Sequence, residues 1–113
     1  MAEFLTRIAT HRCTSGDVWE DIYTVPTDKA IVVSSITVCN TDNAISTFHI
    51  GVSDGGDPSD GESLFSAMQI AENTTVEIKL GITLSEGQIL FVQDPSTRID
   101  YNVFGSIIDQ ITP

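Results

Sequence analysis

Apolar and polar residues alternate through most of this chain, and turn residues interrupt the alternation at short intervals. In the segment 36–40, Ile36 and Val38 fall on one side of an extended chain while Thr37 and Cys39 fall on the other. The segments are short, rich in β-branched and aromatic residues, and bounded by Gly, Pro, Asp and Asn, which predicts strands and no helix. The predicted strands span residues 5–12, 18–25, 30–40, 47–52, 64–71, 75–80, 82–84, 89–93 and 99–108.

Turns that recur about every 8 to 12 residues are typical of an antiparallel sandwich or barrel. The 113 residues of the chain have the length of one ordinary domain. We therefore predict an all-β fold in which residues 1–113 form a single antiparallel β-sandwich of eight or nine strands, jelly-roll-like or immunoglobulin-like. Periodicity does not reveal strand order, so both architectures stay open.

The first and last segments of the chain contain apolar residues, and the sequence pattern does not show which strand or neighbouring molecule covers them. The segment 1–12 is either an edge strand of the sandwich or an N-terminal arm that pairs with a neighbour. The last predicted strand is apolar on both faces, with Phe104 and Ile108 on one side and Tyr101 and Val103 on the other. We expect a second sheet or a neighbouring subunit to cover it, so that both of its faces are buried.

The chain is strongly acidic, with 5 Lys and Arg against 16 Asp and Glu and a formal net charge of −11 at pH 7. The few basic residues are scattered and form no cluster that could neutralise phosphates, so nucleic acid is not an expected partner. The same charge disfavours binding to anionic membranes. It favours solubility at high copy number, or a surface that meets cations or a basic partner.

The longest apolar runs, at 30–33 and 89–92, are far shorter than the roughly 20 residues that a membrane-spanning helix needs. The first residues lack the basic and then apolar pattern of a secretory signal. We therefore expect no membrane segment, and synthesis in a cytoplasm. Cys13 and Cys39 are expected to be reduced thiols, although a disulfide between them is left open.

One acidic segment has a composition that suits a hard cation. Asp54, Asp57, Asp60 and Glu62 place four carboxylates within a short stretch, and Ca²⁺ prefers such oxygen ligands. Their spacing does not fit an EF-hand loop, so we expect a solvated, flexible loop, and a Ca²⁺ site is the alternative.

His11 and Cys13, together with His49 or Cys39, could be drawn as a zinc site. Structural zinc sites normally have paired, closely spaced ligands, and none of these residues are paired in that way. We expect no zinc and no other cofactor.

The sequence contains the residue pattern of one catalytic motif without the structural context that the motif needs. Residues 51–55, GVSDG, match the GxSxG nucleophile elbow, and His11 or His49 could in principle complete a triad. An elbow needs a helix after its turn, whereas the glycine- and proline-containing segment 55–58 follows here. We expect Ser53 to end a strand in a turn, and the protein not to be an enzyme.

Four segments give the chain a recognisable style, namely IYTVPTDKAIVVSSITVCN at 22–40, FHIGV at 48–52, LGITLSEGQILFV at 80–92 and YNVFG at 101–105. Together they make the chain resemble small β-sandwich virion proteins of tailed bacteriophages, which include head decoration or cement proteins and modules near tail fibres. The resemblance covers most of residues 22–108.

The resemblance implies a structural role without a reaction. A cement protein binds the major capsid protein at the capsid surface, commonly as a trimer, and the virion is assembled in the cytoplasm of the host bacterium. Phe4, Leu5 and Ile8 would then be candidates for an arm that clamps a neighbour. Trp19, which stands among acidic residues, is a further candidate interface residue.

A tail, baseplate or fibre-associated module is the alternative function. Such a module could bind carbohydrate, with Trp19, Tyr23 or Tyr101 stacked against a sugar ring. Copy number separates the two functions, because a capsid lattice needs hundreds of copies and a tail only a few.

Overall fold

The computed structural model describes residues 6–59 and 61–109, which form strands and connecting loops. These residues include no helix, and therefore none that is long and apolar enough to cross a membrane. The strands are β1 (Thr6–Arg12), β2 (Glu20–Thr24), β3 (Lys29–Asn40), β4 (Ser46–Ser53), β5 (Ser63–Ile70), β6 (Thr74–Leu84), β7 (Ile89–Gln93) and β8 (Ile99–Asp109).

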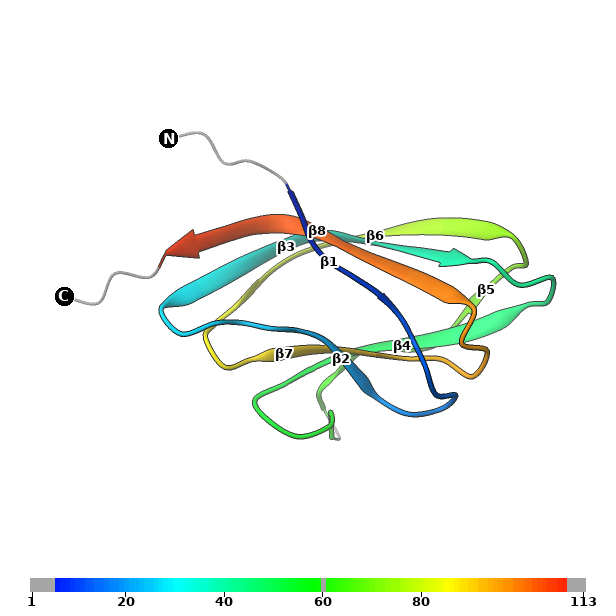
Figure 1. Cartoon of the computed structure of the whole chain (residues 1–113), viewed down its shortest axis with the longest axis horizontal. Coiled ribbons are helices and arrows are strands. Elements are labelled where there is room, and N and C mark those ends of the chain that lie inside the picture. Colours follow the sequence, from blue (N-terminus) through cyan, green and yellow to red (C-terminus); the bar gives the residue numbers. More distant parts are fainter. Residues whose placement is uncertain (1–5, 60, 110–113) are drawn as a thin grey trace.

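The strands form two four-stranded sheets that pack face to face (Figure 1). Sheet A has the order β1-β8-β3-β6 and sheet B the order β2-β7-β4-β5. The antiparallel pairs β1·β8, β2·β7, β3·β6 and β4·β5 make one long ribbon, and rolling it up adds the pairs β3·β8 and β4·β7. The predicted all-β sandwich is confirmed, and this strand order is that of a jelly roll.

The predicted strands agree with the observed ones in position, with one difference in β6. The sequence predicted two strands, 75–80 and 82–84, on either side of Gly81. The strand β6 instead runs through this point, and Gly81, with a φ of 66°, forms a β-bulge. Glycine adopts this left-handed backbone without the steric cost of a Cβ atom.

Bulges in neighbouring strands line up across sheet A. The register shifts at Ile8 in β1, at Ser34 in β3 and beside Gly81 in β6, all at the level of residues 103–105 in β8. Bulges increase the local twist and bend the strand, so this row curves the sheet around the core. A Cβ atom at Gly105 would overlap the backbone oxygen of Val32, which explains the glycine at the bend.

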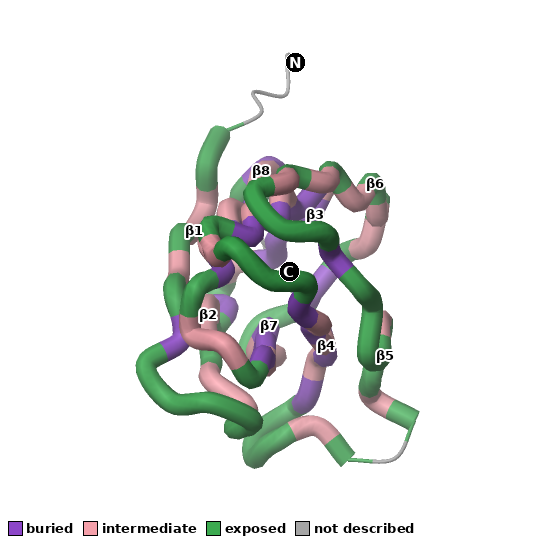
Figure 2. Tube along the Cα trace, turned by 90° about the vertical axis from the view of Figure 1, so that its right-hand side faces the viewer, coloured by how far each residue is buried: buried purple, intermediate pink, exposed green. Residues whose placement is uncertain are grey.

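The core fills the space between the inner faces of the two sheets (Figure 2). Sheet A contributes buried residues such as Ile36, Val38 and Tyr101, and sheet B contributes Phe48 and Leu90. Buried and half-buried residues alternate through most of β3 and β8, as expected for strands with one face toward the core.

Within the single chain, the C-terminal end of the last strand is not covered on both faces, and its cover by a neighbouring subunit stays a prediction. Tyr101 and Val103 are buried and Phe104 is half-buried, but Ile107 and Ile108 are 49% and 38% exposed. The end of β8 reaches beyond the strands of sheet B, so no second layer of the described chain covers it (Figure 1).

The bend in sheet A generates a stability prediction. Gly105→Ala places a methyl group against the Val32 backbone, where no side-chain rotation can relieve the overlap, and we expect a loss of more than about 3 kcal/mol in the free energy of unfolding. Gly55→Ala is the matched control, because a Cβ there meets nothing within 4 Å, and it should change stability by less than about 0.5 kcal/mol. Urea denaturation measures both, and equal effects would contradict the assigned close approach.

Candidate functional site

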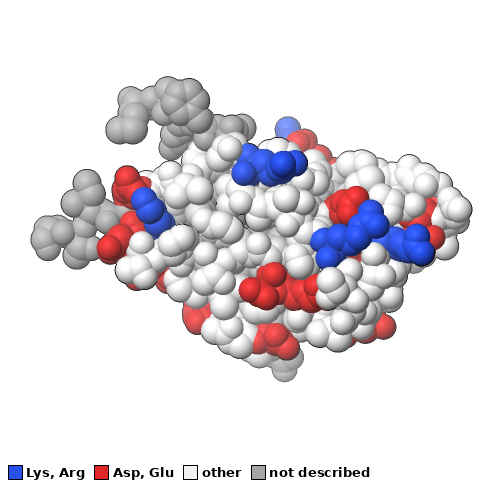
Figure 3. All heavy atoms as spheres, viewed as in Figure 1, with Lys and Arg blue, Asp and Glu red and all other residues white. Residues whose placement is uncertain are grey.

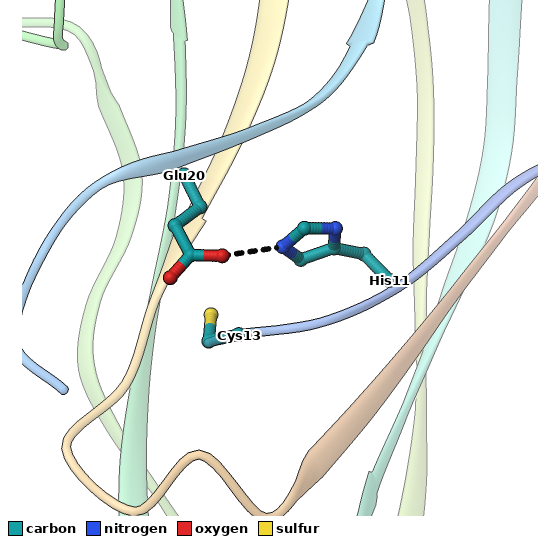
Figure 4. A group of neighbouring side chains, drawn as sticks. All are labelled: His11, Cys13 and Glu20. Atoms are coloured by element: carbon teal, nitrogen blue, oxygen red, sulfur yellow. Dashed lines mark hydrogen bonds and ion pairs between the residues drawn. The ribbon is translucent and has the colours of Figure 1, made fainter. Parts of the chain in front are cut away.

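Polar side chains converge where β1 ends and β2 begins (Figure 4). His11 lies in β1, Cys13 follows the strand, and Glu20 opens β2 on the far side of the connecting loop. One ligand atom from each of the three lies within 4.8 Å of the others. Cys13 is buried, and the side chains of His11 and Glu20 are 23% and 15% exposed. Within residues 6–59 and 61–109, no other three His, Cys, Asp or Glu side chains converge in this way.

Glu20 holds the loop between the two strands. Its Oε2 accepts hydrogen bonds from the backbone N–H groups of Thr14 and Ser15, each at 2.9 Å. Its Oε1 lies 2.9 Å from Nε2 of His11. Because β1 belongs to sheet A and β2 to sheet B, this one carboxylate links the two sheets at a corner of the sandwich.

The hydrogen bonds of Glu20 favour its charged form. Burial alone would raise the pKa of Glu20, but the hydrogen bonds from Ser15, His11 and Thr14 outweigh it and hold the pKa below the ordinary value of 4.5. The carboxylate is therefore ionised at neutral pH.

A second carboxylate lies behind this cluster. Asp94 follows β7, is completely buried, and accepts hydrogen bonds from the Tyr101 hydroxyl at 2.7 Å and the Thr97 backbone N–H at 2.8 Å. Burial, with a further contribution from Asp94, raises the pKa of the Cys13 thiol to about 12, so this thiol is protonated at neutral pH. Burial and Asp94 also raise the pKa of Tyr101.

The position of Tyr101 corrects one expectation. Its side chain is completely buried between the sheets and its hydroxyl is bonded to Asp94, so it cannot stack against a sugar. Tyr23, another predicted sugar-stacking residue, is half-buried in β2.

Trp19 packs against sheet B. Its ring meets Phe91 of β7 and His49 of β4 edge-on, with ring centroids 6.4 and 6.0 Å apart. Leu90 and Val92 face the core, so Phe91, which stands between them in β7, faces the outer side of sheet B. Phe91 is nevertheless buried, because Trp19 packs over it. Trp19 itself is half-buried, and its role at an interface stays a prediction.

Of the predicted arm residues Phe4, Leu5 and Ile8, only Ile8 is among the described residues. Phe4 and Leu5 lie outside the described residues. Residues 6–12 form the edge strand β1, which pairs with β8, and Ile8 is half-buried and packs against the core of its own domain.

The candidate calcium ligands, which the sequence offered only as an alternative to a solvated loop, belong to the segment between β4 and β5. Asp54, Asp57 and Glu62 do not converge with one another, and Oε1 of Glu62 accepts a hydrogen bond from the backbone N–H of Ser59 at 2.9 Å. Asp60 lies outside the described residues, so a site formed by all four carboxylates stays a prediction.

The same loop turns back onto sheet B. A Cβ atom at Gly51 of β4 would come within 2.9 Å of the Pro58 side chain, which shows how closely the loop lies over the strand. Ser53 ends β4 and donates its hydroxyl hydrogen to the backbone oxygen of Gly56. The residues 51–55 that match the nucleophile-elbow pattern therefore form the end of a strand and a turn.

The charges are distributed unequally between the two layers. Lys and Arg occur in β1, β3, β6 and the loop before β8, and no strand of sheet B contains either residue. Figure 3 accordingly shows the basic side chains over the upper layer and at one end, with acidic side chains along the lower layer. Two cations are neutralised locally, because Arg12 pairs with Asp100 and Lys29 pairs with Asp109.

The structure does not bring His11 and Cys13 together with His49 or Cys39, the grouping that the sequence analysis considered and did not favour. His49 lies beside Trp19, and Cys39 is half-buried on the outer side of β3, while both cysteines are free. Glu20 was missed because the turn that brings it back to His11 is not visible in residue spacing. The available signal was the position of Glu20 at the start of the next predicted strand.

Comparison of the chain with known proteins found no matching family model, no matching curated protein and no matching solved structure.

The contacts of Glu20 predict a pH-dependent contribution to stability. Glu20→Gln removes the charge that orders the loop, and we expect a loss of about 1–3 kcal/mol at neutral pH. Because the pKa of Glu20 is lowered in the folded state, this stabilisation is present above pH 4.5 and is lost as the pH falls through the folded-state value. Urea unfolding of both proteins from pH 7 to pH 3 should show curves that converge at acidic pH. Curves separated by a constant amount would contradict the assignment.

The buried pair predicts a second loss of stability. Tyr101→Phe removes the donor to Asp94 and leaves one carboxylate oxygen without its partner, so we expect a loss of about 1–3 kcal/mol. Tyr23→Phe, at a half-buried position in β2, is the control and should change stability by less than about 0.5 kcal/mol. Thermal and urea unfolding measure the two variants, and an unchanged Tyr101→Phe protein would show that the bond contributes nothing.

Proposed function

We propose that this chain is a non-enzymatic structural protein of a tailed-phage virion, and that it acts as a capsid decoration protein. It binds the major capsid protein at the capsid surface and stabilises the head lattice by burial and strand-edge contacts. A homo-oligomer, with a trimer favoured, matches the symmetry points of such a lattice.

The observation that carries the proposal is the jelly-roll order of the eight strands. Jelly rolls recur in viral capsid proteins and in lectins, and the sequence style of residues 22–108 points in the same direction.

The surface is compatible with an assembly role. The net charge of −11 favours solubility, as a protein made in hundreds of copies requires. Apolar side chains are nevertheless exposed on the edge strand β5, where Leu64 and Met68 are 40% and 43% exposed. Two register shifts make β5 irregular, which discourages indiscriminate pairing at this edge.

A tail, baseplate or fibre module that binds carbohydrate is the second candidate. The observation that favours it is the half-buried Trp19 ring, which Phe91 and His49 hold in place on sheet B. A fixed aromatic ring is suited to stack against a sugar.

Copy number in the virion tests the proposal. Quantitative mass spectrometry of purified virions should find about one copy of this chain, or about one third of a copy, for each copy of the major capsid protein. The lower value would mean one monomer at each three-fold position of the lattice, which would support the decoration role and contradict the trimer. A few copies per hundred would favour the tail or fibre module, and absence from the particle would overturn both functions.

A further inference from the structure

The corner between β1 and β2 brings together three donor side chains from residues 11–20, where the chain passes from one sheet to the other. His11 supplies an imidazole nitrogen, Cys13 a sulfur and Glu20 a carboxylate oxygen, and these atoms lie within 4.8 Å of one another (Figure 4). We propose that His11, Cys13 and Glu20 form a binding site for Zn²⁺, with three protein ligands and a fourth position open to water.

The spacing of the donors fits a tetrahedral centre after small side-chain movements. Zinc–ligand bonds of 2.0–2.3 Å place the ligand atoms of a tetrahedral site about 3.3–3.8 Å apart. His11 Nε2 and Glu20 Oε1 are 2.9 Å apart, slightly closer than this, and no pair exceeds 4.8 Å. Binding would therefore require the ligand atoms to shift toward tetrahedral spacing from positions that already lie within 4.8 Å of one another.

The surroundings already orient the ligands. The backbone N–H groups of Thr14 and Ser15 both bind Oε2 of Glu20, which fixes the carboxylate and directs Oε1 toward His11. Hydrogen bonds of this kind to a ligating carboxylate are a regular feature of metal sites. Cys13 is held in place by burial at the end of β1.

The donor set selects the class of metal. Nitrogen and sulfur ligands suit Zn²⁺ and its borderline-soft neighbours, whereas Ca²⁺ and Mg²⁺ prefer oxygen ligands. Binding exchanges the Cys13 S–H bond for a sulfur–metal bond, and the proton is released to solvent. The bound ion would connect β1 of sheet A to β2 of sheet B, so it should also raise the melting temperature of the protein.

Cobalt titration of the full chain tests this site. The reduced protein is freed of metal with a chelator and titrated with Co²⁺, a spectroscopic substitute for Zn²⁺. We expect one equivalent to produce the visible bands of tetrahedral Co²⁺ and a near-ultraviolet thiolate-to-cobalt band. Zn²⁺ should abolish these bands and excess Ca²⁺ should not, because Ca²⁺ competes only for the acidic surface.

Two variants test Cys13 and His11 as ligands, and a third is the control. Cys13→Ala should remove the thiolate band, and His11→Gln, which keeps the thiol, should weaken Co²⁺ and Zn²⁺ binding at least roughly tenfold. Cys39→Ala removes the other free thiol, which lies on β3, and should bind as the unchanged protein does. Far-ultraviolet circular dichroism checks that each variant folds. If Cys13→Ala does not fold, metal binding by His11→Gln provides the test of the site.

The proposal is overturned if no thiolate band forms, if Cys39→Ala weakens binding as much as Cys13→Ala, or if Ca²⁺ displaces the bound ion. The last result would assign metal binding to the carboxylates of the surface.

Discussion

The buried carboxylate of Asp94 is the contact on which one whole end of this sandwich depends. It accepts hydrogen bonds from Tyr101 of β8 and from Thr97 in the loop before β8, while its own backbone oxygen binds the N–H of Asp17 in the loop between β1 and β2. A buried polar group is costly unless it is hydrogen-bonded. Asp94 is completely buried, and its three contacts join two loops and a core strand.

A second buried polar residue, Asn40, also holds loops in place at the same end of the sandwich. Asn40 ends β3 opposite Ile99, and its amide donates to the backbone oxygens of Ala44 and Ala71 in two other loops. Among the described residues, no buried side-chain nitrogen or oxygen lacks a hydrogen-bond partner. The loops at this end are therefore fixed by side chains from the core, which explains how a surface corner can hold His11, Cys13 and Glu20 in a defined arrangement.

The sequence was sufficient for the strands and insufficient for the contacts between them. Alternation along 36–40 follows directly from the two-residue period of a strand, so the core positions Ile36 and Val38 were predictable. The order of strands in the sheets depends on pairings such as β1 with β8, which join residues far apart in the chain. Glu20 and Asp94 acquire their roles only through those pairings, and for this reason neither was recognised as part of a site.

The proposed assembly contact and the proposed metal site lie in different parts of the sandwich. The strand order places β2, with Glu20, and β5, with Leu64 and Met68, at opposite edges of sheet B. An assembly contact through β5 therefore needs no ligand of the metal site, and a zinc ion at the β1–β2 corner would leave β5 unchanged. Trp19 is the exception, because it directly precedes Glu20 and packs on Phe91 in the strand next to β2. A contact made through Trp19 would be the one that a bound metal ion strengthens, since the ion would fix the strand end on which Trp19 stands.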